Sequence, residues 1–94
     1  MNRTIYEKLK AAKPVLRSRF GIEKIALVGS QARGDHTPAS DVDIVILEGE
    51  RDYYKRLGAI KYLSKYLGKR VDLVHIEAIR PVIREYIAKD LVRV

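Results

Sequence analysis

Two aspartates separated by one residue, Asp41 and Asp43, are the side chains of this sequence best suited to chemistry. They open an apolar run that is typical of a β-strand, where alternation places both carboxylates on one face, roughly 7 Å apart along the backbone. Val42, Ile44 and Ile46 then point into the core. Unpaired carboxylates side by side repel each other and resist burial, and a divalent cation relieves that repulsion. Because Mg²⁺ takes one or two protein carboxylates together with phosphate oxygens, the pair predicts a magnesium site for a phosphate-bearing substrate.

A glycine–serine pair before these aspartates supplies the other half of the predicted site. Gly29 lets the backbone approach a ligand closely, and Ser30 opens a helical turn whose N–H groups attract phosphate. Arg33 adds a guanidinium that suits phosphate oxygens, with a surface salt bridge as the alternative. No Gly-Lys-Ser/Thr follows Gly29, so the turn is not a P-loop. The two halves together predict a triphosphate held between the Gly-Ser turn and bound metal.

A third carboxylate, Asp72, lies inside another apolar run. If its strand lies beside the strand of Asp41 and Asp43, the three carboxylates form a cluster that suits two metals about 4 Å apart. The alternative is an edge-strand aspartate paired with Arg70 or a lysine. For Asp41 and Asp43 the alternative is a solvent-exposed pair at the start of a strand.

The elements that position these residues are predicted from hydrophobic periodicity and from helix-capping signals. A helix begins at Thr4, which forms a capping box with Glu7, and ends at Gly21. Pro14 either kinks this helix or begins a second short one. The remaining predictions are strands over 24–28, 41–47 and 70–76, a helical turn over 31–33, a loop over 35–40, a helix over 51–67 stopped by Gly68, and a last helix opened by Pro81.

The predicted order of elements indicates a mixed α/β (α+β) fold, a small three-stranded mixed sheet with flanking helices. The connection between the first two strands is near the minimum length for a parallel crossover, so parallel and antiparallel pairing both stay open. With 94 residues, the chain is predicted to form a single domain over 1–94.

Composition narrows the function classes. The chain has no cysteine, which excludes disulfides and Cys-ligated metal sites. No signal segment and no membrane-length apolar run is present, so we expect a cytoplasmic protein without membrane association. The net charge of +7 suits phosphate-bearing partners, but basic residues spread along the whole chain favour a solvated surface over direct nucleic-acid binding. His36 is expected to be a solvated loop residue and His75 a strand residue at the sheet surface.

The spacing of Gly29-Ser30, ten residues, and then Asp41-Val42-Asp43 resembles the signature of the DNA polymerase β-like nucleotidyltransferase superfamily. The resemblance implies the polymerase β-like fold, with ATP as substrate and two Mg²⁺ ions as cofactor. It implies Asp41, Asp43 and Asp72 as catalytic metal ligands. It also implies a nucleotide-binding set of Gly29, Ser30, Arg33 and Ser40.

Within that superfamily, Gly-Ser-x-Ala-Arg-Gly followed by Ser-Asp-x-Asp resembles the minimal nucleotidyltransferase (MNT) family of antitoxins, which are paired with HEPN-domain toxins. Gln31 stands where that family often has Arg. The resemblance implies AMP transfer from ATP to a tyrosine of a HEPN-type toxin. Occlusion of the toxin without catalysis, and transfer to a small-molecule acceptor, are the alternatives.

The sequence leaves the assembly open between homo-oligomer and hetero-oligomer. Exposed aromatic and apolar residues are predicted to form a partner surface, and the alternative is that the C-terminal ones complete this domain's own core. The predicted surface comprises Tyr62, Tyr66, Tyr86 and the segment Leu91–Val94.

Overall fold

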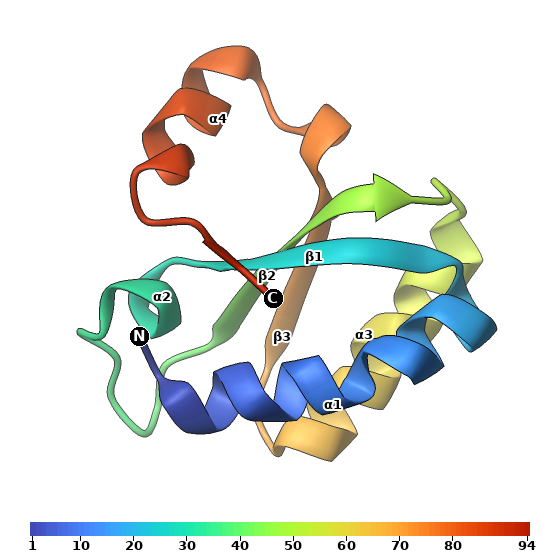
Figure 1. Cartoon of the computed structure of the whole chain (residues 1–94), viewed down its shortest axis with the longest axis horizontal. Coiled ribbons are helices and arrows are strands. Elements are labelled where there is room, and N and C mark those ends of the chain that lie inside the picture. Colours follow the sequence, from blue (N-terminus) through green and yellow to red (C-terminus); the bar gives the residue numbers. More distant parts are fainter.

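A four-stranded sheet in the order β3-β2-β1-β4 organises the computed structural model, which describes every residue from Met1 to Val94 (Figure 1). The elements in chain order are α1 (Arg3–Phe20), β1 (Ile22–Val28), α2 (Ser30–Arg33), β2 (Val42–Gly49), α3 (Tyr53–Leu67), β3 (Val71–His75), the 3₁₀ helix η1 (Ile76–Ala78), α4 (Pro81–Ala88) and β4 (Val92–Arg93).

The sheet is mixed, as predicted. β1 pairs antiparallel with β2, which settles the question that the sequence left open, and β2 pairs parallel with β3. The predicted count of three strands is wrong by one. The two-residue strand β4 pairs antiparallel with β1 at Ala26 and Leu27, and it is too short for periodicity to reveal.

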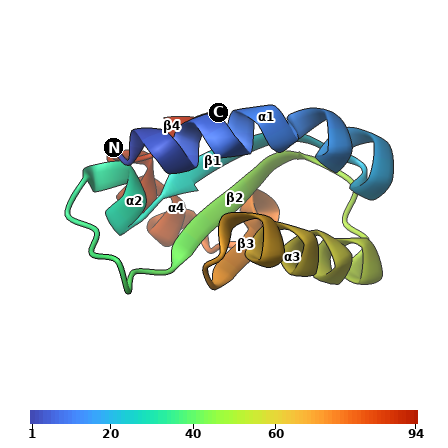
Figure 2. The same cartoon turned by 90° about the horizontal axis from the view of Figure 1, so that it is seen from below.

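One face of the sheet is covered by α1 and α3, which pack against each other and against the strands (Figure 2). Their inward residues, such as Leu9 and Leu63, are fully buried, and Ile44 and Ile46 meet them from β2 as predicted. The opposite face of the sheet carries Asp43, and α4 stands over that face (Figure 1). Since α4 buries no residue at all, this side stays open.

The helix ends show which capping signals are used. The cap of α1 is Asn2, whose side chain accepts a hydrogen bond from the Ile5 amide at 3.3 Å, so the predicted Thr4–Glu7 capping box is wrong. Asn is as good an N-cap as Thr, and capping at Asn2 adds Arg3 and Thr4 to the helix. α1 continues through Pro14, so no second helix begins there. Gly21 and Gly68 end α1 and α3 in the left-handed region, as predicted.

The C-terminal segment belongs to the core of this domain. Val92 and Val94 pack against the hydrophobic cluster, and Lys13 donates a hydrogen bond to the Val94 carbonyl at 2.9 Å. Tyr62 is also packed against the cluster. Of the tyrosines in the predicted partner surface, Tyr66 and, on α4, Tyr86 therefore remain exposed.

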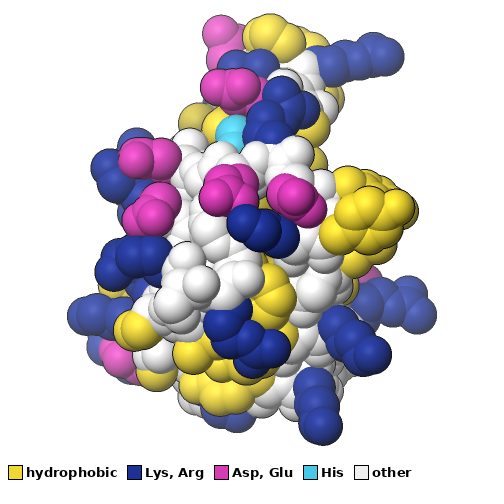
Figure 3. Space-filling view, turned by 90° about the vertical axis from the view of Figure 1, so that its right-hand side faces the viewer, with side chains coloured by type: hydrophobic (Ala, Val, Ile, Leu, Met, Phe, Trp, Pro, Cys, Tyr) yellow, Lys and Arg dark blue, Asp and Glu magenta, His cyan; other side chains and the backbone are white.

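Basic side chains do not gather into one patch on the face shown in Figure 3. They are spread among acidic and apolar side chains over the whole view. None of the helices combines the length and the apolar character that a membrane crossing requires.

Candidate functional site

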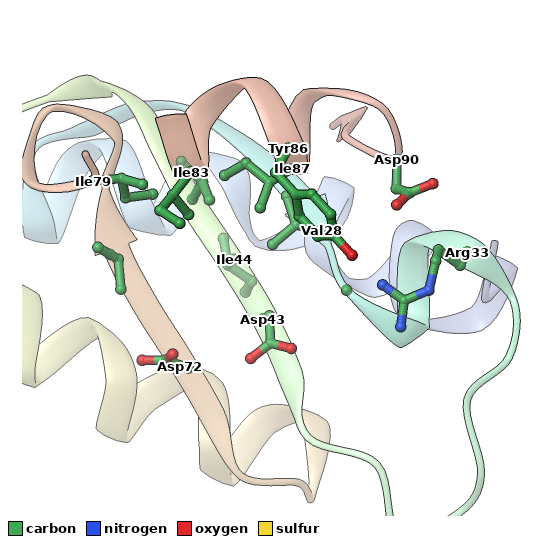
Figure 4. Close-up of a pocket in the computed structure, with 13 residues that line it drawn as sticks. Val28, Arg33, Asp43, Ile44, Asp72, Ile79, Ile83, Tyr86, Ile87 and Asp90 are labelled. Carbon is green, nitrogen blue, oxygen red and sulfur yellow. The ribbon is translucent and has the colours of Figure 1, made fainter. Parts of the chain in front are cut away.

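The register between β2 and β3 places Asp43 directly opposite Asp72. Neighbouring strands lie about 4.8 Å apart and register partners point to the same face, so the two carboxylates stand side by side. Both line a pocket of about 300 Å³ on the sheet face beneath α4 (Figure 4). Asp43 is partly buried and Asp72 is exposed on the edge strand. None of the ion pairs in the structure involves Asp72, so the predicted alternative of an Asp72 paired with Arg70 or a lysine is not formed.

The pocket floor carries excess negative charge. Burial raises the pKa of the Asp43 carboxyl, the charges of Asp72 and Asp41 raise it further, and Arg33 opposes them. A nearby cation stabilises the ionised form of such a carboxyl group. Oxygen donors at this spacing suit Mg²⁺, whose remaining positions go to water and phosphate oxygens. The donor set therefore fits a magnesium ion shared with a nucleotide.

Gly29 makes room for the Asp43 carboxylate. Its backbone has φ 72° and ψ −153°, a region open essentially to glycine alone. A Cβ at this position would lie 2.6 Å from Asp43 Oδ2. The glycine therefore lets the end of β1 pass directly under the carboxylate, and α2 begins one residue later, at Ser30.

Arg33, at the end of α2, brings positive charge to the rim of the same pocket. Its Nε donates to Asp35 Oδ2 at 3.1 Å, and this partner raises the pKa of the guanidinium, which stays charged. The salt bridge and the phosphate-binding role, predicted as alternatives for Arg33, are compatible. The ion pair engages Nε, and Figure 4 shows the terminal nitrogens directed toward the side of Asp43.

Three predicted site residues lie outside the pocket lining. Asp41 is exposed and precedes the first paired residue of β2, where strand alternation is not yet enforced. Ser40 uses its hydroxyl within the loop, where Oγ accepts from the Thr37 amide at 2.8 Å. Ser30 stands behind Gly29 as the first residue of α2. No three acidic or imidazole side chains come close enough to enclose a metal by themselves, so the predicted three-carboxylate cluster reduces to Asp43 and Asp72. The charge of Asp41 still acts on Asp43.

Gln31 has a role that its sequence position did not indicate. It is the one fully buried polar side chain, and it does not line the pocket. Its Oε1 accepts from Asn2 Nδ2 at 2.8 Å, and its Nε2 donates to the carbonyls of Ser40 and Asp41, both at 3.4 Å. The amide therefore ties the start of α1 to the loop that delivers Asp41. In a motif of the phosphate-binding type, no sequence pattern distinguishes a buried structural amide from one that faces the ligand.

The upper part of the pocket is apolar, which sequence reasoning also missed. Ile79, Ile83, Ile87 and Val28 line it, and Figure 4 shows Ile87 and Tyr86 beside Val28, and Ile79 at the other end. Ile83 and Ile87 on α4 have the helical spacing that usually marks a core face, and Ile79 lies in the extended segment before the helix. Here that face lines an open pocket beside the carboxylates, which suits the apolar part of a ligand with a charged end.

The two histidines have structural surroundings. His75 ends β3 at the sheet surface, as predicted, where Nδ1 accepts from the Glu77 amide at 3.2 Å and Nε2 lies 3.3 Å from the Gly49 carbonyl. Because Nδ1 is an acceptor, the ring proton lies on Nε2 and is donated to that carbonyl. His36 is partly buried in the loop, with Nδ1 buried and unpaired, so the expectation of a solvated side chain is wrong for that atom.

Comparison with known sequences agrees with this geometry. The nucleotidyltransferase domain family matches residues 9–94. A Methanocaldococcus jannaschii protein classed as a candidate protein adenylyltransferase is 38% identical over 94 residues, covering 96% of this chain and 94% of the relative. The protein adenylyltransferase MntA of Thermococcus cleftensis is 37% identical over 87 residues, covering 92% of this chain and 88% of that protein.

Solved structures share the same architecture. A candidate minimal nucleotidyltransferase superposes with a TM-score of 0.79 at 27% identity, covering 98% of this chain and 95% of that one. A toxin–antitoxin crystal structure with AMP-PNP gives 0.74 at 25% identity, covering 99% and 72%. The complex of a tri-AMPylated Shewanella oneidensis HEPN toxin with its MNT antitoxin, at 20% identity, a TM-score of 0.70 and coverage of 99% and 71%, shares the fold. This chain belongs to the nucleotidyltransferase domain family, and its resemblance to minimal nucleotidyltransferases is confirmed.

Proposed function

We propose that this chain is a Mg²⁺-dependent protein adenylyltransferase that transfers AMP from ATP to a tyrosine of a HEPN-type toxin and thereby neutralises it. The observation that carries the proposal is the pairing of Asp43 with Asp72 on adjacent strands, over a pocket that also holds the Gly29 turn and Arg33. Carboxylates, a close-approach glycine and a free guanidinium edge are the parts that nucleotidyl transfer needs.

Each residue has a separate task in this proposal. Asp43 and Asp72, with Asp41 beside them, would hold magnesium, which when bound neutralises phosphate charge and lowers the pKa of the attacking hydroxyl. The amides that follow Gly29 donate to phosphate oxygens, and Arg33 binds them from the rim. Asp72, exposed at the sheet edge, accepts the proton of the incoming hydroxyl. Most of the catalysis is then positioning and charge compensation.

The partner assignment rests on relatives. The similar Thermococcus protein is named as a protein adenylyltransferase, and a structure of similar fold is a toxin–antitoxin pair with a nucleotide analogue. The pocket supports an external acceptor because it is open beside α4, which buries nothing. Occlusion of the toxin without transfer, and a small-molecule acceptor, are the two outcomes that would replace this proposal.

The test is incubation of the co-purified partner with ATP and Mg²⁺, followed by intact-mass and peptide mass spectrometry. AMP on a partner tyrosine is expected for the wild type and is expected to disappear with Asp43→Asn. Asp52→Asn is the matched control, because Asp52 caps α3 away from this pocket and Asn caps equally well. A stable complex whose partner stays unmodified would instead establish occlusion.

A further inference from the structure

We propose that Tyr86 of this chain is itself an acceptor, so that the protein adenylylates its own α4 when no partner fills the site. The inference rests on the proposed function, because it uses the same nucleotide and the same carboxylates. It adds a modification site within the chain and a class of product, an AMP–tyrosine phosphodiester.

The position of Tyr86 carries the inference. Its side chain lines the pocket together with Asp43, Asp72 and Arg33. Figure 4 shows its hydroxyl directed from α4 toward the end of the pocket where Asp43 and Arg33 lie. That end is the place for the phosphates of a bound nucleotide, since it combines the carboxylate pair with the guanidinium. A phenol oxygen is thus held above the reacting group rather than on a distant surface.

Accessibility alone does not single out Tyr86. The chain has six tyrosines, and Tyr86 is the one that lines this pocket. Tyr54 is more exposed, at 81% against 70% for Tyr86, but it lies at the start of α3 on the covered side of the sheet. A reaction that followed exposure would label Tyr54, whereas a reaction that follows the site would label Tyr86.

The attachment of α4 gives Tyr86 the freedom that in-line attack requires. None of the residues of α4 is buried, and the helix begins at Pro81 after the extended residue Arg80. Elements with few buried contacts open and shift at little free-energy cost. A small movement of α4 can therefore align the hydroxyl with the α-phosphorus of ATP without disturbing the sheet.

The proposed step forms one bond to phosphorus and breaks another. Tyr86 Oη attacks the α-phosphorus, a new P–O bond forms, and the bond from that phosphorus to the α–β bridging oxygen breaks. Pyrophosphate leaves with the bond electrons, and the phenol proton passes to the carboxylate pair of Asp43 and Asp72. The product carries a bulky anion on α4 in the mouth of the pocket, which predicts that a modified chain transfers AMP to other acceptors more slowly.

The experiment uses the full chain alone with ATP labelled at the α-phosphate and Mg²⁺, followed by peptide mapping. Label on Tyr86 is expected. With Tyr86→Phe, which keeps the ring and removes the nucleophile, label is expected to fall by about tenfold or more. Tyr54→Phe is the matched control and should label like the wild type. Thermal unfolding of both variants checks that α4 and the core are retained.

A mixing experiment tests whether the transfer is intramolecular. Asp43→Asn, which keeps Tyr86 but lacks the carboxylate, is incubated with the Tyr86→Phe chain, which keeps the site. The Asp43→Asn chain should stay unlabelled, and label appearing on its Tyr86 would overturn the intramolecular geometry.

A parallel reaction with the partner toxin separates the two proposals. Label on the partner in this reaction, together with no label on Tyr86 when the chain is incubated alone, would refute self-modification and leave the proposed function standing. Label on neither would count against both, and label on Tyr54 at the level of Tyr86 would show that exposure, not the site, selects the acceptor.

Discussion

At Gly29 the backbone and the Asp43 carboxylate share a space too small for any side chain. Gly29→Ala would place a Cβ 2.6 Å from Asp43 Oδ2 and force alanine into a region that costs on the order of 1–3 kcal/mol. We expect the variant to lose stability and, below its melting temperature, to lose most of its transfer activity, because the carboxylate must move. Thermal melts and labelled-ATP assays measure the two effects.

Gly68→Ala is the control for Gly29→Ala. Gly68 also has a positive φ, of 67°, but a Cβ there meets nothing within 4 Å. Its substitution should therefore lower stability by about 1–2 kcal/mol through backbone strain and leave transfer intact. Equal loss of transfer in both variants would mean that general destabilisation, and not displacement of Asp43, is responsible.

The raised pKa of Asp43 predicts a pH-dependent stability in the metal-free protein. Burial, then Asp72 and Asp41, raise the pKa of this carboxyl above its ordinary value of 3.8, so the folded state binds the proton more tightly than the unfolded state. The contribution of this carboxyl to stability is then most favourable below pH 3.8 and is lost as pH rises through the raised pKa. Asp43→Asn removes that loss and should melt higher than the wild type at neutral pH by about a few degrees.

Low pH and added Mg²⁺ each test whether ionised Asp43 causes this difference in Tm. Well below pH 3.8 the carboxyl is neutral in both states, so the difference in Tm between Asp43→Asn and the wild type should close. Adding Mg²⁺ at neutral pH should stabilise the wild type more than the variant, because the ion binds the folded carboxylates. A wild type that melts above Asp43→Asn at neutral pH without metal would contradict the cause assigned to the pKa shift.

At the scale of elements, α4 is the least anchored helix of the fold. It buries no residue, whereas α1 buries five and β2 four. Its amides should exchange with deuterium much faster than those of β1 and β2, since opening α4 exposes little apolar surface. Mg²⁺ with a non-hydrolysable ATP analogue should slow exchange in α4 selectively, because the ligand fills the pocket beneath it. Protection of α4 equal to that of β2 in the free protein would refute this account.

Hydrophobic periodicity predicted the helices and strands whose apolar faces are buried. It could not distinguish a helix face buried in the core from one that lines an open pocket. The isoleucines of α4 have the spacing of a core helix, but Ile83 and Ile87 line an open pocket. Local patterns can also compete. Asn2 caps α1 although Thr4 and Glu7 match a capping box, because both starting points are chemically acceptable and tertiary contact decides. Asn2 is held in place by the buried amide of Gln31.

The residue types of the site were predictable, but their arrangement depended on pairing between distant segments. Alternation placed Asp43 on the face opposite Ile44 correctly. The parallel register that sets Asp43 against Asp72 comes from the α3 crossover and the packing of Leu63 and Leu73, which one short strand pattern cannot specify. For the same reason Asp41, just before the paired part of β2, is placed by loop contacts that the sequence does not reveal.

At the scale of the whole molecule, the fold leaves exposed apolar surface beside its open site. The C-terminal segment completes the core, so the surface available to a partner near the pocket is the outer side of α4, where Val82 is 68% exposed and outside the pocket lining. An acceptor hydroxyl that reaches Asp72 from another protein must pass the rim that α4 forms. We therefore expect α4 to be part of the contact with a HEPN-type partner, and the chain's net charge of +7 to favour an acidic surface opposite it.

Val82→Glu tests this contact without touching the pocket. A buried charge in an apolar contact should weaken partner binding by about tenfold or more, while ATP binding by the chain alone stays at its wild-type level. Tyr54→Glu introduces the same charge at a site that is 81% exposed on α3 and should leave partner affinity unchanged. Calorimetry with the purified partner and, separately, with ATP and Mg²⁺ measures both quantities. Equal weakening by the two variants would assign the effect to net charge, and unchanged binding of Val82→Glu would place the partner on a face other than α4.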